Sequence, residues 1–344
     1  MEIKKCKKCG FILGTRPGLR DINGVCMPCI NHEKKQTIDF AARQKWLTEY
    51  IAENRKPNAK WDCAVGVSGG KDSTAIVKRL IENHGIKDPL LIHVTDEFTH
   101  SQAGTYNLHH LAEVYNLDTL ELRCQPRTFI EETRKDFFES LHPLKWIEEQ
   151  LYQMPLQIAK AFDINLIFYG ENSGFEYGGS DTLDIFHPSS DEHTKLIFTG
   201  AIYPYSNFDS YEQAKQIGFK NLSDFDEWYR QGSIDDFAQI DSIGYMVHHW
   251  CKFIKFGFQR VSDMACRFVR EGKLTKEQAE ELIQDRDYML DPQAKSDFCR
   301  SLVISHEDFD ATVDRFANTE LLAKDANGYW RRKDLYTRMY DCYK

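Results

Sequence analysis

The stretch Val65-Gly66-Val67-Ser68-Gly69-Gly70-Lys71-Asp72-Ser73-Thr74 decides the fold of this chain. Residues 61–67 are mostly apolar and predict a short buried strand, whereas residues 73–83 carry apolar side chains at helical spacing. The two glycines between them allow a tight turn and a close approach to a ligand. The N–H groups that open a helix have no intrahelical partners, and the helix dipole adds positive potential there. The segment therefore predicts a strand, a turn and a helix that together bind phosphate.

The residues of the turn indicate which kind of phosphate site this is. Asp72 stands where the Walker pattern requires Ser or Thr after its lysine, and the sequence lacks the G-x-G-x-x-G dinucleotide pattern here as well. The pattern S-G-G-x-D-S is complete over residues 68–73. It resembles the PP-loop of N-type ATP pyrophosphatases, which bind the β,γ-pyrophosphate of ATP and cleave ATP at the α-phosphorus. The alternative is an ordinary glycine-rich turn, but five specified residues in a strand–turn–helix context favour an ATP site.

Composition limits the class of protein. The chain has 344 residues, of which 42% are hydrophobic, enough for one large domain with appendages or for two domains. No apolar run approaches about 18 residues, so we expect no membrane span, and the N-terminus lacks the apolar core of a signal peptide. We therefore expect a cytoplasmic protein, in which ten cysteines indicate metal ligands or free thiols before disulfides. A net charge of −9 argues against nucleic acid as the partner of the chain as a whole.

Two cysteine pairs, Cys6-x-x-Cys9 and Cys26-x-x-Cys29, predict a metal site near the N-terminus. Four thiolates at this spacing can bind Zn²⁺ tetrahedrally, with no open position, which indicates a structural ion. We expect a zinc ribbon over residues 1–35, followed by a helix and a polar linker over residues 36–58. Four unrelated thiols, or a redox-active or iron–sulfur pair, are the alternatives.

Further apolar runs predict a parallel α/β sheet. Strands are expected at residues 90–95, 118–123 and 164–169, with a helix around residues 105–114. Ligands of such sheets lie at the carboxyl ends of the strands, so we expect Thr95 and Gly170 to contact the nucleotide. This ATP-binding domain is expected over residues 59–255. Residues 173–206 are loop-like, and we interpret the region around 173–240 as an insertion on the substrate side.

The rest of the chain predicts a last strand at residues 243–250 and a helical C-terminal region over residues 256–344. On a strand, His248 and His249 would point to opposite sides, which argues against a metal site there. One helix is expected to begin at a cap formed by Ser262 or Asp263, and Thr275-x-x-Gln278 has the pattern of a capping box. Other helices are expected near residues 211–217, 224–230, 294–302 and 306–317.

Several segments together resemble one family, the N-acetyl sugar amidotransferases, which are PP-loop enzymes of surface-polysaccharide and nonulosonic-acid biosynthesis. The resemblance runs from about Cys6 to about Asp291. The segments that carry it are the four-cysteine ribbon, the S-G-G-K-D-S loop, Gly170-Glu171-Asn172 with Glu176-Tyr177-Gly178-Gly179, and Lys255-Phe256-Gly257-Phe258-Gln259-Arg260.

The resemblance implies an ATP-dependent reaction with Mg²⁺ that turns an acetamido group of a sugar into an acetamidino group. The amide oxygen would attack the α-phosphorus of ATP, pyrophosphate would leave, and ammonia would then displace AMP. Such a loop stabilises the charge that grows on the departing pyrophosphate. The residues expected to donate hydrogen bonds to the β,γ-phosphates are Ser68, Gly69, Gly70, Ser73 and Thr74.

Other roles follow from the same resemblance. Asp72 would hold Mg²⁺ or brace the loop, and Lys71 would either reach phosphate or face water. Glu171 would bind Mg²⁺ or sugar hydroxyls, unless it only caps the next turn. Lys255 would bind a carboxylate or phosphates, with a surface salt bridge as the alternative. The residues expected to bind the sugar are Glu171, Asn172, Glu176, Tyr177 and Arg260, and the residues expected to be catalytic are Asp72, Ser73, Glu171 and Lys255.

Two other functions compete with this hypothesis. A PP-loop enzyme that thiolates tRNA would use a cysteine in the cleft, for which Cys124 at the end of the third strand is the candidate. A scaffold with a vestigial loop is the second, but an intact S-G-G-K-D-S argues against decay of the site.

The source of ammonia is a separate question. None of the ten cysteines has the setting of a glutaminase nucleophile, so we expect a separate glutaminase subunit. The family resemblance adds partners similar to the glutaminase and cyclase subunits of imidazole-glycerol-phosphate synthase.

Overall fold

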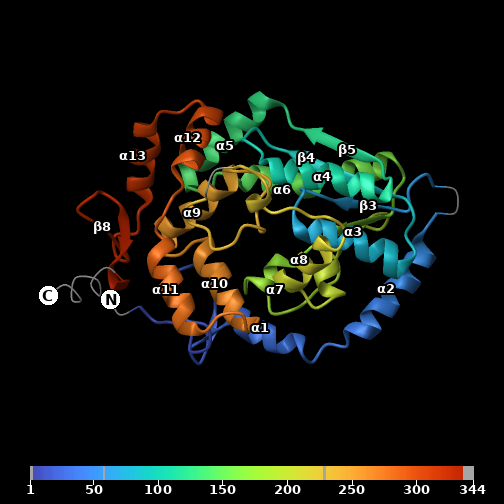
Figure 1. The fold of residues 1–344 in the computed structure, drawn as a ribbon, viewed down its shortest axis with the longest axis horizontal. Coiled ribbons are helices and arrows are strands. Elements are labelled where there is room, and N and C mark those ends of the chain that lie inside the picture. Colours follow the sequence, from blue (N-terminus) through green and yellow to red (C-terminus); the bar gives the residue numbers. More distant parts are fainter. Residues whose placement is uncertain (1–2, 57–58, 228–229, 336–344) are drawn as a thin grey trace.

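A five-stranded parallel sheet forms the centre of the fold (Figure 1). The computed structural model describes residues 3–56, 59–227 and 230–335. The strand order is β5-β4-β3-β6-β7, and every neighbouring pair is parallel. The expected parallel α/β class is therefore confirmed. The strands are β3 (Cys63–Gly66), β4 (Pro89–Thr95), β5 (Thr119–Arg123), β6 (Leu166–Tyr169) and β7 (Lys195–Phe198).

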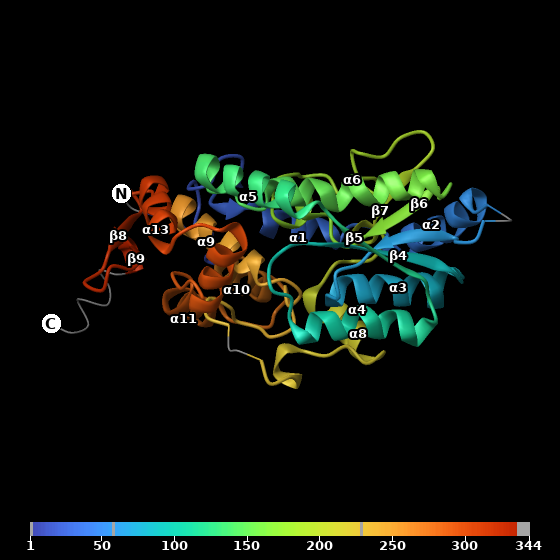
Figure 2. The ribbon, with the colours of Figure 1, turned by 90° about the horizontal axis from the view of Figure 1, so that it is seen from above.

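Helices cover both faces of this sheet because successive residues of each strand point to opposite sides. Val65 packs into an apolar layer with α2 (Phe40–Asn54), α3 (Lys71–His84) and α4 (Gln102–Tyr115). Its neighbour Ala64 faces the other layer, which α6 (Lys145–Ala161) covers. Figure 2 shows the two layers of helices above and below the strands. Two more helices extend these layers, α5 (Pro126–Ser140) beside α6 and α8 (Asn207–Lys215) beside α3.

The insertion contributes to the sheet, which the sequence analysis did not anticipate. Residues 173–206, expected to be loop-like, contain α7 (Ser173–Glu176), the edge strand β7 and a 3-10 turn, η1 (Thr199–Ala201). The four residues of β7 form too short an apolar run to stand out from the polar residues around them. Of the two helices expected near residues 211–217 and 224–230, the first is α8. At the second, the described residues hold only a 3-10 turn, η2 (Leu222–Asp224), and residues 228–229 lie outside the description.

The expected strand at residues 243–250 is wrong, because this segment is helix α9 (Gly244–Phe256). Val247, Cys251 and Ile254 recur at helical spacing and are buried against α12 and α13. Gly257 ends the helix with φ 75°, the left-handed conformation that favours glycine. A short apolar run does not by itself distinguish a strand from a helix. The 13 residues of α9 are longer than a typical strand, and this length favours the helix.

The C-terminal region is helical, as expected, but one predicted cap is wrong. α10 (Arg260–Arg270) begins after Gln259, so Ser262 and Asp263 lie within its first turn instead of capping it. Thr275 and Gln278 do form the predicted capping box of α11 (Lys276–Arg286). The remaining elements are α12 (Pro292–Leu302), α13 (His306–Phe316) and a hairpin that was not expected, β8 (Leu322–Lys324) with β9 (Trp330–Arg332).

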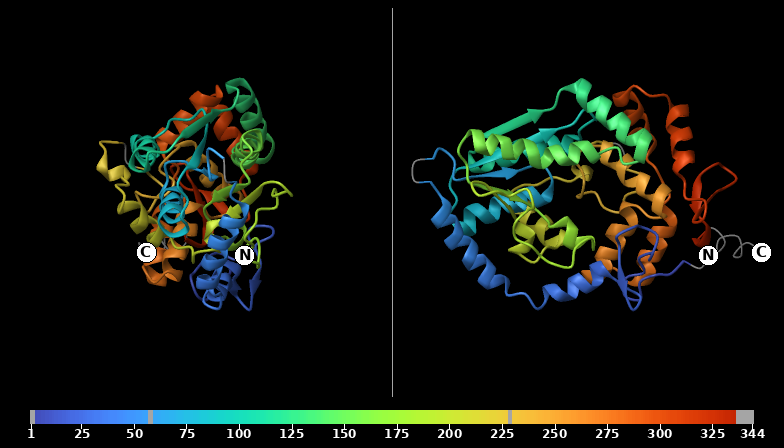
Figure 3. Two further views of the ribbon diagram at one scale, coloured as in Figure 1. Left: turned by 90° about the vertical axis from the view of Figure 1, so that its right-hand side faces the viewer. Right: turned by 180° about the vertical axis from the view of Figure 1, so that it is seen from behind.

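The N-terminal segment packs against this helical region (Figures 1 and 3). It contains β1 (Asp21–Ile22), β2 (Val25–Cys26) and α1 (Met27–Lys35). Phe11 lies against Phe258, with ring centroids 4.8 Å apart, in a cluster shared with α10 and α11. The polar linker therefore does not separate this segment from the rest of the fold. The domain boundaries given above stay predictions.

Close backbone approach also joins α1 to the insertion. Gly178 has φ 80°, and a Cβ placed on it would lie 2.6 Å from Cδ of Pro28 and 2.9 Å from Cβ of Met27. Only glycine fits there without moving α1. Among the described residues, no helix combines the length and the apolar character that a membrane crossing requires.

Candidate active site

The 68–73 loop connects β3 directly to α3, as predicted. Gly69 has φ 78°, and a Cβ on it would lie 2.1 Å from the carbonyl oxygen of Gly104, so a larger residue would displace the loop. Ser73 Oγ and Thr74 Oγ1 donate to the carbonyl oxygen of Gly70, at 3.1 and 3.0 Å. These hydroxyls thus brace the turn. No side chain of the described residues caps the start of α3, whose N–H groups remain available to an anion.

The buried Lys71 and the half-buried Asp72 form an ion pair beside the loop. Lys71 is only 3% exposed, which corrects the expectation that it might face water, and its Nζ lies 2.7 Å from Asp72 Oδ2. Tyr205 Oη donates to the same oxygen at 3.3 Å. Burial would raise the pKa of Asp72, but the charge and hydrogen bond of Lys71 outweigh burial and lower it. Oδ1 of Asp72 is buried and has no hydrogen-bond partner among the described residues, which fits a carboxylate that awaits a cation.

A second buried cation, Arg267 of α10, was missed by the sequence analysis. Arg267 Nη1 donates to Glu171 Oε2 at 3.2 Å, and its guanidinium lies over the rings of Tyr177 and Tyr205, 4.7 and 5.2 Å from their centroids. Its Nε and Nη2 have no hydrogen-bond partner among the described residues, although the side chain is only 3% exposed. Two unsatisfied donors on a buried guanidinium fit an anionic ligand. Arg260 and Arg267 share one face of α10, and that i, i+7 spacing is the sequence signal that could have found Arg267.

Glu171 joins the loop region to a neighbouring cavity. It follows β6, and its carboxylate lies near Asp72 and Arg267. Burial raises its pKa, the Arg267 charge opposes this, and repulsion from Asp72 and Glu176 adds to it. A carboxyl group with a raised pKa at a cavity wall is a candidate for proton transfer.

The cavity has a volume of about 630 Å³ and brings together four of the predicted residues, Glu171, Tyr177, Lys255 and Arg260. Arg260 Nη1 donates to Tyr177 Oη at 3.0 Å, so these two side chains form one wall. Lys255 lies farther along, where its Nζ donates to the carbonyl oxygen of Ser140 at 3.1 Å. Other lining residues come from the N-terminal segment, α6, α9 and α10, among them Arg16, Glu148, His248, Lys252 and Asp263.

Two residues predicted to bind substrate have structural partners instead. The Asn172 side chain accepts a hydrogen bond from the Phe175 N–H at 3.2 Å and caps α7. Glu176 is buried and lies 2.8 Å from Lys35 Nζ, so its charge holds α1 against the insertion. Neither is among the described residues that line the cavity.

The two residues predicted at strand ends differ in their relation to the loop. Gly170 lies against Asp72, since a Cβ added to it would be 3.5 Å from Asp72 Cβ. Thr95 ends β4, and its hydroxyl contacts Asp96 and His100, with Oγ1 3.3 Å from His100 Nε2. A contact of either residue with a nucleotide stays a prediction.

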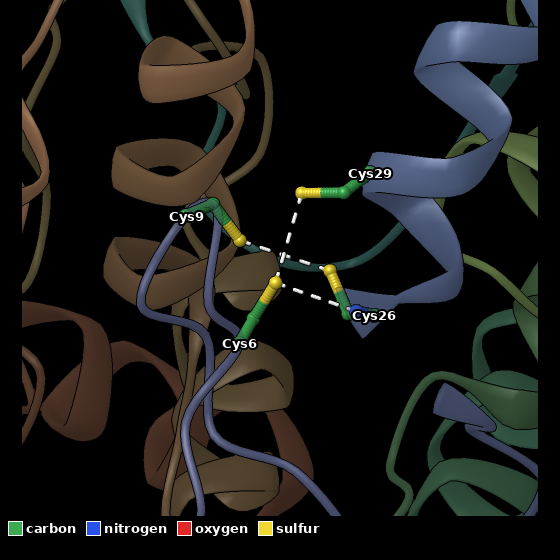
Figure 4. A group of neighbouring side chains, drawn as sticks. All are labelled: Cys6, Cys9, Cys26 and Cys29. Atoms are coloured by element: carbon green, nitrogen blue, oxygen red, sulfur yellow. Dashed lines mark hydrogen bonds between the residues drawn. The ribbon is translucent and has the colours of Figure 1, made fainter. Parts of the chain in front are cut away.

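The four N-terminal cysteines converge on one point (Figure 4). Sulfur atoms of Cys6 and Cys29 lie 3.9 Å apart, and those of Cys9 and Cys26 lie 3.7 Å apart. A tetrahedral Zn²⁺ with bonds of about 2.3 Å holds its sulfurs about 3.8 Å apart, so the donor set and its geometry fit that ion. Hydrogen bonds from Cys26 and Cys29 lower the pKa of Cys6 to about 6. Arg270 Nη1 lies 3.9 Å from Cys9 Sγ and adds a positive charge beside the thiolates.

Cys124, the candidate sulfur carrier, lies apart from this arrangement. It is half-buried after β5, with Sγ 3.5 Å from Met154 Sδ, and burial raises its pKa. A raised pKa lowers the fraction of reactive thiolate. Cys124 is not among the described residues that line the cavity.

Comparison with known proteins adds a family to this geometry. Residues 220–336 match the family described as "LPS biosynthesis protein WbpG-like, C-terminal domain". The C-terminal region of this chain is similar to that family, and residues 220–336 are called the WbpG-like region below. This region carries Lys255, Arg260 and Arg267, so the WbpG-like segment supplies the part of the site that faces the 68–73 loop across Glu171. It also extends beyond residue 291, where the resemblance was expected to end, and is consistent with the predicted PP-loop amidotransferase family.

Other similarities are more distant. An uncharacterized protein of Methanocaldococcus jannaschii is 21% identical over 281 residues, which cover 80% of this chain and 93% of that protein. Solved structures also match, among them the following three.

The NMN synthetase from Francisella tularensis is 13% identical, with a TM-score of 0.39, over 70% of this chain and 96% of that one. The NH3-dependent NAD synthetase from Campylobacter jejuni is 14% identical, with a TM-score of 0.36, over 77% and 95%. The U34-tRNA thiolase NcsA from Methanococcus maripaludis, with its [4Fe-4S] cluster, is 13% identical, with a TM-score of 0.31, over 99% and 97%.

Proposed function

We propose that this chain is an ATP-dependent amidotransferase of surface-glycan biosynthesis. It would adenylate the acetamido oxygen of an N-acetylated sugar and replace it with ammonia, giving an acetamidino group, AMP and pyrophosphate. The observation that carries this proposal is the juxtaposition of two parts. An intact S-G-G-K-D-S loop lies, through Glu171, beside a cavity whose opposite wall comes from the WbpG-like region.

The loop side supplies the groups that ATP requires. The free N–H groups at the start of α3 would bind the β,γ-phosphates, together with the hydroxyls of Ser73 and Thr74 if these turn from the Gly70 carbonyl. Bound Mg²⁺ would neutralise phosphate charge, and the free Oδ1 of Asp72 is the oxygen that fits it. Arg267, with two unsatisfied donors, would hold the α-phosphate or the departing pyrophosphate.

The cavity side would hold the sugar. Tyr177 and Arg260 form a wall that can bind hydroxyls or an anionic group, and Lys255 adds a cation farther out. An amide is a poor electrophile, and adenylation turns its oxygen into a leaving group. Ammonia then forms the new C–N bond, the C–O bond to AMP breaks, and one proton of the incoming nitrogen must leave. Glu171 would accept that proton, because its raised pKa makes it a better base than an ordinary carboxylate.

Two further parts of the proposal concern the metal and the ammonia. The four thiolates would hold a structural Zn²⁺, because a polynuclear iron–sulfur cluster places metal and sulfide atoms between its cysteines and spreads their sulfurs farther apart. A separate glutaminase subunit, with a cyclase-like partner, would supply ammonia in the cell. Ammonium salt at raised pH would replace it in the test tube, and glutamine alone would not.

The experiment is direct. The purified chain is incubated with ATP, ammonium salt and a panel of N-acetylated sugars, free and nucleotide-linked, and products are analysed by mass spectrometry. We expect AMP together with a sugar whose mass falls by about one mass unit, since NH replaces O. Cys124→Ser should keep this activity. Absence of AMP with every sugar of the panel would contradict the proposal. Formation of thiolated tRNA by the unaltered chain, with loss of this product in the Cys124→Ser variant, would also contradict it.

A further inference from the structure

Three side chains from different segments meet on a wall of the same cavity. His142 lies between α5 and α6, Glu148 is on α6, and His248 is on α9. His142 Nε2 lies 3.4 Å from Glu148 Oε2, and His248 Nε2 lies 3.4 Å from Glu148 Oε1. We name these three residues the His–Glu–His cluster. Their ligand atoms all lie within 4.8 Å of one another.

The spacing is that of a metal site before its ion is bound. A tetrahedral ion with bonds of 2.0–2.1 Å holds its ligand atoms about 3.3–3.4 Å apart. Each imidazole lies 3.4 Å from one oxygen of Glu148, and the two use different oxygens, so an ion could be reached by small rotations of these side chains. Two imidazoles and one carboxylate form the set that binds Zn²⁺ or Fe²⁺ with positions left open for another ligand. The helical structure of α9 makes this possible, because His248 is presented to α6 independently of His249.

The burial of His248 is the second observation. It is 8% exposed and lines the cavity, yet its Nδ1 has no hydrogen-bond partner among the described residues. The neighbouring His249 also leaves its Nδ1 without a partner among the described residues, so the observation that bears on a ligand is the other nitrogen of His248. A buried imidazole turns that Nε2 toward a carboxylate at the cavity wall.

Nearby lysines would disfavour a cation if their charges were unpaired. Lys252 is paired with Asp263 at 2.5 Å, which leaves little net charge from that pair. Lys255 directs its Nζ to the carbonyl oxygen of Ser140 at 3.1 Å. The carboxylate of Glu148 lies between the two imidazoles and offsets the remaining charge.

We infer that the His–Glu–His cluster binds a divalent transition-metal ion, with Zn²⁺ as the first candidate, and presents an open coordination position to the cavity. An oxygen of a carboxylate, phosphate or hydroxyl group would occupy that position. This site is separate from the four-thiolate site and from the 68–73 loop. The inference does not depend on the proposed reaction with ATP.

The test is a metal count on the full-length chain. Protein is equilibrated with excess Zn²⁺, passed through gel filtration with a weak chelator, and analysed for zinc. We expect two equivalents in the unaltered chain and one each in His142→Ala, Glu148→Gln and Cys26→Ser. His109→Ala is the matched control, because His109 lies 3.4 Å from Glu121 on the surface and has no third ligand there among the described residues. It should retain two equivalents.

Cobalt identifies which site is filled. Co²⁺ at the thiolate site gives intense sulfur-to-metal charge transfer, whereas Co²⁺ at nitrogen and oxygen ligands gives only weak d–d bands. The weak bands should persist in Cys26→Ser and vanish in Glu148→Gln. The zinc count and the cobalt spectrum of the unaltered chain test the inference even if a variant fails to fold. A single zinc equivalent, with only sulfur-type cobalt bands, would overturn the inference.

Discussion

Asp72 and Arg267 show how single residues prepare the site for charged ligands. Asp72 is held by Lys71 and Tyr205 through one carboxylate oxygen, and the other oxygen has no partner among the residues that the structure describes. Arg267 is held by Glu171 through one nitrogen, and two of its donors have no partner in the same described part of the chain. Unsatisfied buried groups cost about 1–3 kcal/mol each, so a bound ligand that satisfies them would stabilise the folded chain.

The first prediction concerns Asp72. Asp72→Asn should lower the rate of AMP formation by about 10²–10³-fold, the usual effect of removing one group that stabilises developing charge. The fold should persist, because Lys71 and Tyr205 still contact the amide. Asp209→Asn is the control, since Asp209 of α8 forms an exposed ion pair with Arg79. Near-normal turnover by Asp72→Asn would remove Asp72 from the reaction.

The second prediction uses the pKa of Glu171. Its carboxylate form would be the base, so activity should rise with pH through its pKa, which burial already raises. The Arg267 charge opposes that rise, so Arg267→Met should move the acidic limb of the pH–rate profile to higher pH. Arg267→Lys should restore part of the shift. A lower rate with an unmoved profile would show that Arg267 acts only as a structural residue.

At the scale of elements, the turn between β3 and α3 was predictable and parts of its surroundings were not. S-G-G-K-D-S predicted the backbone conformation that the structure shows, because few residues can occupy so tight a turn, and its ligand stays a prediction. In contrast, β7 is only four residues long and gives a weak signal in the sequence. The apolar residues of α9 fit the spacing of a strand as well as that of a helix until the length of the element is known. His248 of α9 lines the cavity and Arg267 of α10 contacts Glu171 at its wall, and only tertiary packing brings them there.

The third prediction concerns the loop. Gly69→Ala should abolish ATP consumption, because its Cβ would lie 2.1 Å from the Gly104 carbonyl oxygen. Gly85→Ala is the matched control: Gly85 also has positive φ, at 68°, but nothing lies within 4 Å of an added Cβ. That control should cost about 1–2 kcal/mol of stability and leave ATP consumption intact. Equal loss of activity in both variants would mean that strain alone, and not the contact with Gly104, matters.

The fourth prediction concerns the link between the four cysteines and α10. Cys266 Sγ donates to the Cys9 carbonyl oxygen at 3.3 Å, and Phe11 packs on Phe258. Removing the metal, or changing Cys26 to Ser, should therefore loosen α10 as well as residues 3–35 and weaken activity. Hydrogen exchange would show the loss of protection in α10. Unchanged exchange in α10 would instead support an N-terminal segment that unfolds by itself.

The whole molecule joins three regions around one cavity. The sheet supplies Glu171, whose carboxylate lies near Asp72 of the 68–73 loop. The WbpG-like region supplies much of the cavity wall, and the N-terminal segment adds Arg16 and packs against α10. The class of fold and the ATP loop followed from the sequence because both depend on contiguous residues. The cavity did not, because it depends on how distant helices pack.

The proposed attack of the amide oxygen on ATP can be tested by following that oxygen. An N-acetylated sugar that the chain converts is prepared with a heavy-oxygen label in its acetamido group and incubated with ATP and ammonium salt. If the amide oxygen attacks the α-phosphorus, AMP must carry the label after ammonia displaces it, and pyrophosphate must not. We expect labelled AMP in amounts equal to the amidine formed. Unlabelled AMP alongside the amidine, or label in pyrophosphate or free phosphate, would contradict the proposed reaction.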